Sequence, residues 1–264
     1  MEADPRRGQQ RGGPGVTIAD CAALVERGDP DRFLATMAAP PAARARLLPL
    51  YAFNLEVARA PWAAQEPLVA EMRLQWWREV VENTAAGAAR AHEVAEPLHG
   101  LIREAGLPLP ILDRMVAARR WDCWREPFAD RAALVDYLED TAAGPMWLAA
   151  LVLGAPAGAE AAVRAYGRAA GMAGFLAAAP ELQARGRYPL PGGTDVPALA
   201  RLGLDWLAAA RAGRHTVPKG VVPALLAGWQ APGLLRRMAA GKPAQLSEFA
   251  RRGGLLWQAT TGRW

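Results

Sequence analysis

The sequence predicts an all-α protein, with one helical domain following a short arm. From Ile18 onward the helix formers Ala, Leu, Arg and Glu dominate, and alternating β-branched residues are scarce. Proline and glycine fall mostly between the helical segments. No repeat of fixed period and no break in composition divides the chain. Its 264 residues, 52% of them hydrophobic, can build a core without disulfides or a structural metal.

The start of the chain differs in composition from the rest. We expect residues 1–17 to form a disordered basic arm and residues 18–264 to form the domain, because the first fifteen residues are rich in Gly, Arg and Gln without apolar periodicity. No apolar segment follows the arm, so we expect no secretory signal. No run of about 18 uncharged apolar residues occurs, so we expect no transmembrane helix.

The helices of the first half have recognisable start and stop signals. Asp20 can cap a helix that continues to Arg27 and is ended by the Gly-Asp-Pro at 28–30. Pro40 and Pro41 suit the first turn of another helix, where a missing N–H costs nothing. The segment 66–84 has apolar residues at three-and-four spacing. In order, the predicted helices here are 20–27, 31–38, 40–56, 66–84, 91–105 and 110–122.

The helices of the second half are bounded chiefly by proline and glycine. They are predicted at 131–153, 157–179, 196–212, 221–229, 233–239 and 245–260. On the first of them, Asp136, Glu139 and Asp140 share one side at i, i+3 and i+4 spacing. Such a face can hold magnesium through carboxylate oxygens, or it can be a solvated acidic stripe. A site that ionises an allylic diphosphate needs a second, facing cluster.

Residue counts exclude several classes of site. Two cysteines and three histidines cannot make a disulfide framework or a zinc ribbon, and Ser247 is the only serine. All but two of the 31 basic residues are arginine, which is typical of GC-rich bacterial coding. The net charge of +5 is modest, and neither a zinc finger nor an RNA-binding aromatic motif is present. We therefore expect no metal and no nucleic-acid partner.

Five motifs, in this order and at these spacings, resemble the squalene/phytoene synthase family. They are Asp31–Ala35, Leu50–Phe53, Leu74–Arg78, Tyr137–Gly144 and Gly186–Pro191. The resemblance implies a helical isoprenoid-synthase fold around a central cavity, lined by the helices that carry residues 51–58, 74–81, 137–147 and 171–182. It also implies the chemistry of the active members, which condense two prenyl diphosphates with magnesium held by two Asp-rich motifs.

The chain departs from the family at those two motifs. Alignment on the flanking residues puts the acids of the first motif at Ala58, Arg59 and Trp62, and those of the second at Ala178 and Leu182. Alanine and leucine cannot ligate magnesium, and Arg59 would repel it. The resemblance therefore implies that the metal–diphosphate machinery is lost from both sides of the cavity, and we expect no catalytic residue and no cofactor.

Two segments are similar to a non-catalytic branch of the family, whose best-known members are mitochondrial assembly factors of respiratory complex I. These segments are Tyr51–Ala58 and Met72–Trp77. The resemblance implies a binding or assembly factor whose protein partners are subunits of a membrane respiratory complex. Candidate ligand-binding residues in the cavity are Tyr51, Asn54, Trp77, Tyr137 and Arg187.

Two other functions stay open. An active or diverged head-to-head prenyltransferase could use Glu56, Glu139, Asp140 and Glu181 as replacement magnesium ligands. Alternatively, a carrier could hold an apolar isoprenoid-like lipid or quinone in the old cavity without turning it over.

The expected location is cytoplasmic, with peripheral attachment to the inner face of the plasma membrane. Tryptophan is frequent, with ten residues, and suits a membrane interface. Trp257 and Trp264 lie near Arg251 and Arg252, and the end of a chain is normally at the surface. We therefore predict that both tryptophans are exposed on a basic interfacial segment.

Overall fold

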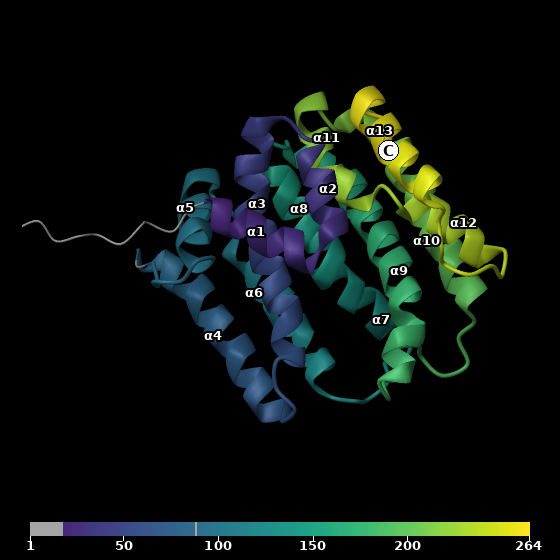
Figure 1. Cartoon of the computed structure of the whole chain (residues 1–264), viewed down its shortest axis with the longest axis horizontal. Helices are drawn as coiled ribbons and strands as arrows, with labels where there is room; N and C mark the ends of the chain where they lie inside the picture. Colours follow the sequence, from purple (N-terminus) through teal and green to yellow (C-terminus); the bar gives the residue numbers. More distant parts are fainter. Residues whose placement is uncertain (1–17, 88) are drawn as a thin grey trace, which may run out of the picture.

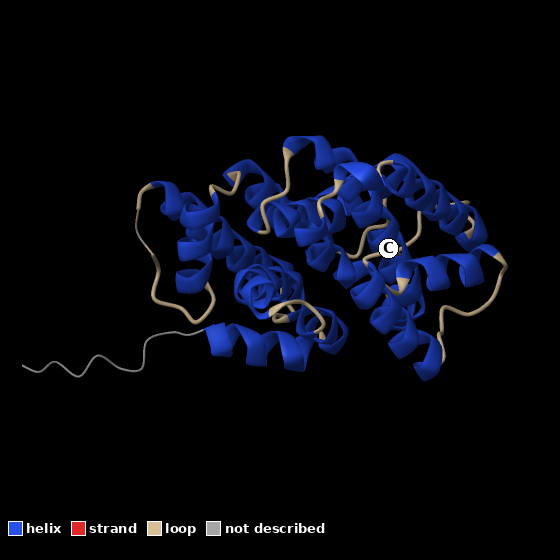
Figure 2. Ribbon diagram, turned by 90° about the horizontal axis from the view of Figure 1, so that it is seen from above, coloured by secondary structure: helices blue, strands red, loops and turns tan. Residues whose placement is uncertain are grey.

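A computed structural model describes residues 18–87 and 89–264, and every regular element within these ranges is helical (Figures 1 and 2). The predicted all-α class is confirmed, and the predicted arm lies outside the described residues. The α-helices are α1 Ile18–Gly28, α2 Pro30–Met37, α3 Pro41–Arg59, α4 Pro67–Ala85, α5 Ala95–Ala105, α6 Leu109–Ala118, α7 Arg131–Leu138, α8 Gly144–Val152, α9 Glu160–Ala184, α10 Val196–Ala212, α11 Val222–Leu225, α12 Ala231–Ala239 and α13 Glu248–Thr261.

Side-chain caps fix several of these helix starts. The carboxylate of Asp29 accepts a hydrogen bond from the Arg32 amide at 2.9 Å, and Pro30 fills the first position of α2. Asp130 caps α7 and Ser247 caps α13 in the same way. The cap predicted at Asp20 is not where the structure begins the helix, because α1 already includes Ile18.

Two helix boundaries near prolines differ from the prediction. The helix predicted over residues 131–153 contains a π-helical turn, η3 Glu139–Ala143, between α7 and α8. Pro145 comes two residues after the end of η3. It has no N–H to donate to the carbonyl four residues earlier, which favours a wider turn at this point. The next long helix, α9, does not end at Ala179 as predicted but continues through Pro180 to Ala184.

The core surrounds α3, the helix whose residues from Leu47 to Asn54 are all buried. Helices α8 and α9 add a second apolar layer, and Figure 1 shows α8 beside α3 with α9 on the far side of α8. Helices α4 and α5 lie on one side of this centre, and α10, α12 and α13 lie on the other.

Helix α9 approaches η3 very closely because it presents glycine there. A Cβ atom on Gly167 would lie 2.6 Å from the Cα of Ala143, and one on Gly171 would lie 2.4 Å from the Cβ of Ala142. Atoms at these separations overlap, so only glycine allows the two segments to pack at this distance.

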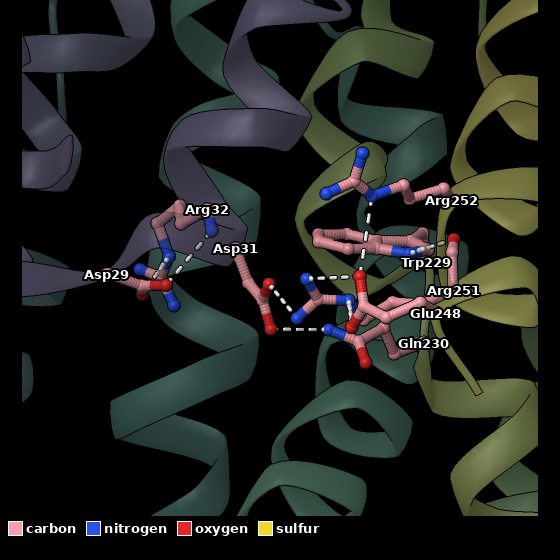
Figure 3. A network of polar contacts seen from close by, with 8 residues as sticks. All are labelled: Asp29, Asp31, Arg32, Trp229, Gln230, Glu248, Arg251 and Arg252. Carbon is pink, nitrogen blue, oxygen red and sulfur yellow. Dashed lines mark hydrogen bonds and ion pairs between the residues drawn. The ribbon is translucent and has the colours of Figure 1, made fainter. Parts of the chain in front are cut away.

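Helix α13 is attached to α2 by a separate small cluster of apolar residues and by a polar network (Figure 3). Asp31 accepts hydrogen bonds from Arg251 at 2.9 Å and from Gln230 at 2.7 Å. Glu248 pairs with Arg251 at 3.2 Å, and the Trp229 indole donates to the Arg251 carbonyl at 3.1 Å. One face of α13 is therefore held against α2 and against Trp229.

The expected exposure of the two C-terminal tryptophans is only half right. Trp257 is 51% exposed, whereas Trp264 is 1% exposed. The Trp264 ring meets Tyr166 edge-on at 5.0 Å, and the Arg214 guanidinium lies 5.2 Å from the ring centre. Its main-chain oxygen accepts hydrogen bonds from Arg211 and Arg214. Contacts with Arg211, Arg214 and the buried Tyr166 thus stabilise Trp264 in its buried position.

Candidate functional site

The central cavity has a volume of about 470 Å³. Its wall comes mainly from α3, from the continuous segment α7–η3–α8, and from α9. Arg32 of α2 and Ala224 of α11 close one part of it. Most of the wall is apolar, including Leu138, Met146 and Phe175. The cavity can therefore accommodate a hydrocarbon group.

Four of the five positions at which the resemblance places lost acids line this cavity. They are Ala58, Trp62, Ala178 and Leu182. The fifth, Arg59, is exposed and is not part of the wall. None of the side chains at the four lining positions offers a carboxylate oxygen.

The four candidate replacement ligands are not brought together. Glu139 pairs with Arg164 at 2.8 Å and with Arg168 at 3.2 Å, both on α9. Asp140 lies 3.4 Å from Arg114 of α6; burial raises the pKa of its carboxyl, and Arg114 opposes that shift. Glu181 is exposed and pairs with Arg185 at 2.5 Å, four residues along the same helix. Glu56 is half-buried and does not line the cavity.

These residues do not fit the magnesium that the fold family implies. Magnesium prefers octahedral oxygen ligands, and a diphosphate site needs acids on both sides of the substrate. Here the paired positions carry alanine, tryptophan and leucine, while Glu139 and Asp140 are bound to arginines outside the wall. Within residues 18–87 and 89–264, no cluster of three or more His, Cys, Asp or Glu could hold a metal ion.

The candidate ligand-binding residues divide into two groups. Tyr51 and Tyr137 line the cavity. Asn54 and Trp77 are buried outside its wall, and the Trp77 ring packs edge-on against Phe53 at 5.4 Å. Arg187 lines an adjoining hollow instead, where its guanidinium lies 4.9 Å from the Trp62 ring centre.

One helix predicted to line the cavity does not do so. Residues 74–81 of α4 were expected in the wall, but none of them contributes to it. Leu74, Trp77, Val80 and Val81 are instead buried in the core. The apolar spacing of α4 identified a buried face correctly, but spacing does not reveal whether a buried face meets a cavity or other side chains.

A buried polar network in the cavity wall was not predicted. Arg119 and Asp122 lie on the 3₁₀ segment η2 Arg119–Cys123, and Tyr137 lies on α7. Arg119 Nη1 donates to the Tyr137 hydroxyl at 2.7 Å and lies 3.4 Å from Asp122 Oδ2. The Tyr137 hydroxyl donates to the same Asp122 oxygen at 2.8 Å. The i, i+3 spacing of Arg119 and Asp122 could have indicated their pairing from the sequence. Nothing in the sequence indicated that Tyr137, 15 residues after Asp122, would join them.

The electrostatics of this network follow from burial and from its own charges. Burial raises the pKa of Tyr137 well above its usual range, so the phenol stays protonated. Burial acts to lower the pKa of Arg119, but Tyr137 and Asp122 outweigh it and the pKa is raised. The network thus holds one positive and one negative charge, which together sum to zero.

Solved structures define the class of fold to which this cavity belongs. A dehydrosqualene synthase in complex with ligand superposes with a TM-score of 0.75 and 13% identity, over 93% of this chain and 95% of that one. The squalene synthase HpnC from Alicyclobacillus acidocaldarius superposes with a TM-score of 0.68 and 20% identity, over 86% of this chain and 95% of that one. At these identities the similarity establishes the helical isoprenoid-synthase fold alone.

A sequence model of squalene/phytoene synthase matches residues 25–193, and the chain therefore belongs to the squalene/phytoene synthase family. Human NADH dehydrogenase (ubiquinone) complex I, assembly factor 6, is 26% identical over 182 residues, which cover 68% of this chain and 55% of that protein. Its Drosophila melanogaster homolog is 29% identical over 176 residues, which cover 63% of this chain and 52% of that protein. The chain thus spans about half the length of the curated relatives it matches.

The described part of the chain contains no candidate membrane-spanning helix. Across those residues, every helix is too short or too polar to cross a bilayer.

Proposed function

We propose that this protein assists the assembly of a membrane respiratory complex of the complex I class and acts by binding rather than by prenyl transfer. The observation that carries the proposal is the composition of the cavity wall. Ala58, Trp62, Ala178 and Leu182 stand where the family resemblance places the acids of the active enzymes. The similarity to complex I assembly factor 6 supports the same function.

The chemistry of prenyl transfer explains why this wall favours binding. A departing diphosphate must be neutralised as its bond to carbon breaks, and metal ions do this in two-sided sites. The carboxylate in the present wall belongs to Asp122, which already pairs with Arg119 and accepts a hydrogen bond from Tyr137. Arg32 of the wall is likewise neutralised by Asp29, and the other side chains are mostly apolar, so the wall suits a hydrocarbon better than a multiply charged leaving group.

A factor that serves a membrane complex needs a route to the membrane surface, and α13 supplies a suitable face. Phe249 is 89% exposed and Leu256 65% exposed, and their separation of seven residues places them on one side of the helix with Trp257 nearby. Arg252 and Arg263 are exposed close to these residues. Apolar side chains flanked by arginines suit an anionic lipid surface, and α13 is held to α2 by the Arg251–Asp31 pair shown in Figure 3.

Replacing Phe249, Leu256 and Trp257 together by serine is expected to reduce binding to vesicles of anionic phospholipid at least about tenfold, because three apolar side chains lose their place in the interface. Co-sedimentation at low and high salt measures this, and salt should weaken binding of the native chain. The matched control is Leu68→Ser with Met72→Ser, a similarly exposed apolar pair on α4. Equal binding by native chain and triple variant would contradict the membrane face.

The assembly role is tested in the organism that encodes the chain. Deleting the gene should lower the amount of fully assembled NADH dehydrogenase complex on a native gel, while its subunits are still made. Reintroducing the native chain should restore the complex. Normal assembly in the deletion strain would exclude the proposed function.

A further inference from the structure

The cavity wall contains an unusual combination of groups. Beside its apolar residues it carries three charged side chains, Arg32, Arg119 and Asp122. Arg32 is paired with Asp29 at 3.1 Å, and Arg119 is paired with Asp122. Each cation that touches the cavity is therefore already neutralised by a carboxylate of the protein.

Arg119 nevertheless keeps donors to spare. A guanidinium has five N–H donors. Among the described residues only its Nη1 finds partners, and its Nε is buried without one. The side chain keeps 18% of its surface exposed, and it lines the cavity. Because the exposed part of the guanidinium faces the cavity and still has N–H groups to donate, an acceptor oxygen brought into the cavity can be bound here.

The same corner has an aromatic surface on which an apolar group can rest. Phe175 and Tyr137 both line the cavity, and their ring centres are 6.0 Å apart. Trp121 and Phe128 stack behind them at 4.0 Å. One end of the cavity is thus a polar corner with unused donors and no net charge, and the rest is apolar.

From this juxtaposition we propose that the cavity binds a neutral lipid, namely a hydrocarbon chain with an uncharged oxygen at one end that accepts a hydrogen bond from Arg119. An alcohol and a quinone share this chemistry. A diphosphate does not, because each arginine of the wall is neutralised by an aspartate, so the corner has no net positive charge to balance it, and the Asp122 carboxylate is already bound to Arg119. This ligand site is independent of the proposed assembly role, and its failure would leave that role standing.

The test compares two probes with the same chain and different ends, geranylgeraniol and geranylgeranyl diphosphate. Binding to the full chain is followed by tryptophan fluorescence and by native mass spectrometry, with and without magnesium. Geranylgeraniol is expected to bind at least about tenfold more tightly than the diphosphate under both conditions. No binding of the alcohol, or tighter binding of the diphosphate, would overturn the proposal. Decylubiquinone as a third probe distinguishes a quinone from an alcohol.

Variants locate the site. Arg119→Lys keeps a positive charge beside Asp122 but loses the planar set of donors, and should weaken geranylgeraniol binding on the order of tenfold. Arg78→Lys is the matched control, because Arg78 also pairs with an aspartate, at 2.6 Å, and does not line the cavity. Unchanged affinity in Arg119→Lys, or equal losses in both variants, would refute the role of Arg119.

A second variant does not depend on the polar corner. Gly174 lines the cavity, and no atom lies within 4 Å of where its Cβ would be. Gly174→Phe should therefore fold, fill the cavity and abolish geranylgeraniol binding, while Gly174→Ala should leave it unchanged. Full binding by Gly174→Phe would show that the lipid binds elsewhere and would overturn the proposal.

Discussion

The Trp264→Ala variant is expected to lose about 3–5 kcal/mol of its free energy of unfolding. The native indole is almost fully buried, meets Tyr166 edge-on and lies beside the Arg214 guanidinium. Truncation removes the burial of a large ring, the aromatic contact and the cation–π contact together. Urea denaturation followed by circular dichroism measures the change.

Trp257 provides the matched control for this variant. It lies on the last turns of α13, but half of its surface is exposed. Trp257→Ala should therefore change the free energy of unfolding by about 0.5 kcal/mol or less. Similar losses in the two variants would contradict the burial of Trp264 against Tyr166.

Gly167→Ala is expected to lower the free energy of unfolding by about 2 kcal/mol, although alanine is the better helix former. The added methyl group would lie 2.6 Å from the Cα of Ala143, which is backbone and cannot rotate away. The same substitution at Gly174, two turns later on α9, meets open space. It should raise the free energy of unfolding by up to about 1 kcal/mol, and thermal melting compares the pair.

Both glycine variants gain the same helix propensity, so their difference isolates the close approach of α9 to η3. A stable Gly167→Ala would mean that the two segments lie farther apart than the structure places them. A destabilised Gly174→Ala would mean that the space beside that residue is filled.

Helix positions could be predicted from the sequence because they depend on local signals. The caps and prolines at the start of α2 and α3 and the apolar spacing of α4 each act within a few residues. The π-turn before Pro145 and the passage of α9 through Pro180 depend on how the backbone adjusts around a proline. Tertiary packing decides that adjustment, so the sequence pattern did not reveal it.

The cavity was only partly predictable. The resemblance to the family identified Ala58, Trp62, Ala178 and Leu182, which do line the wall, because the motifs fix positions along helices. It did not identify Arg119 as a wall residue. The burial of Trp264 was missed as well, because its contacts with Tyr166 and Arg214 are about 100 and 50 residues apart in sequence.

The most direct test of a binding rather than catalytic role is the release of inorganic diphosphate from farnesyl or geranylgeranyl diphosphate with magnesium. The full chain is expected to release no more than a sample without protein, because the wall offers no magnesium ligands at the four positions. Magnesium-dependent release that is lost in Glu139→Gln or Asp140→Asn would contradict this account and identify the protein as a diverged prenyltransferase.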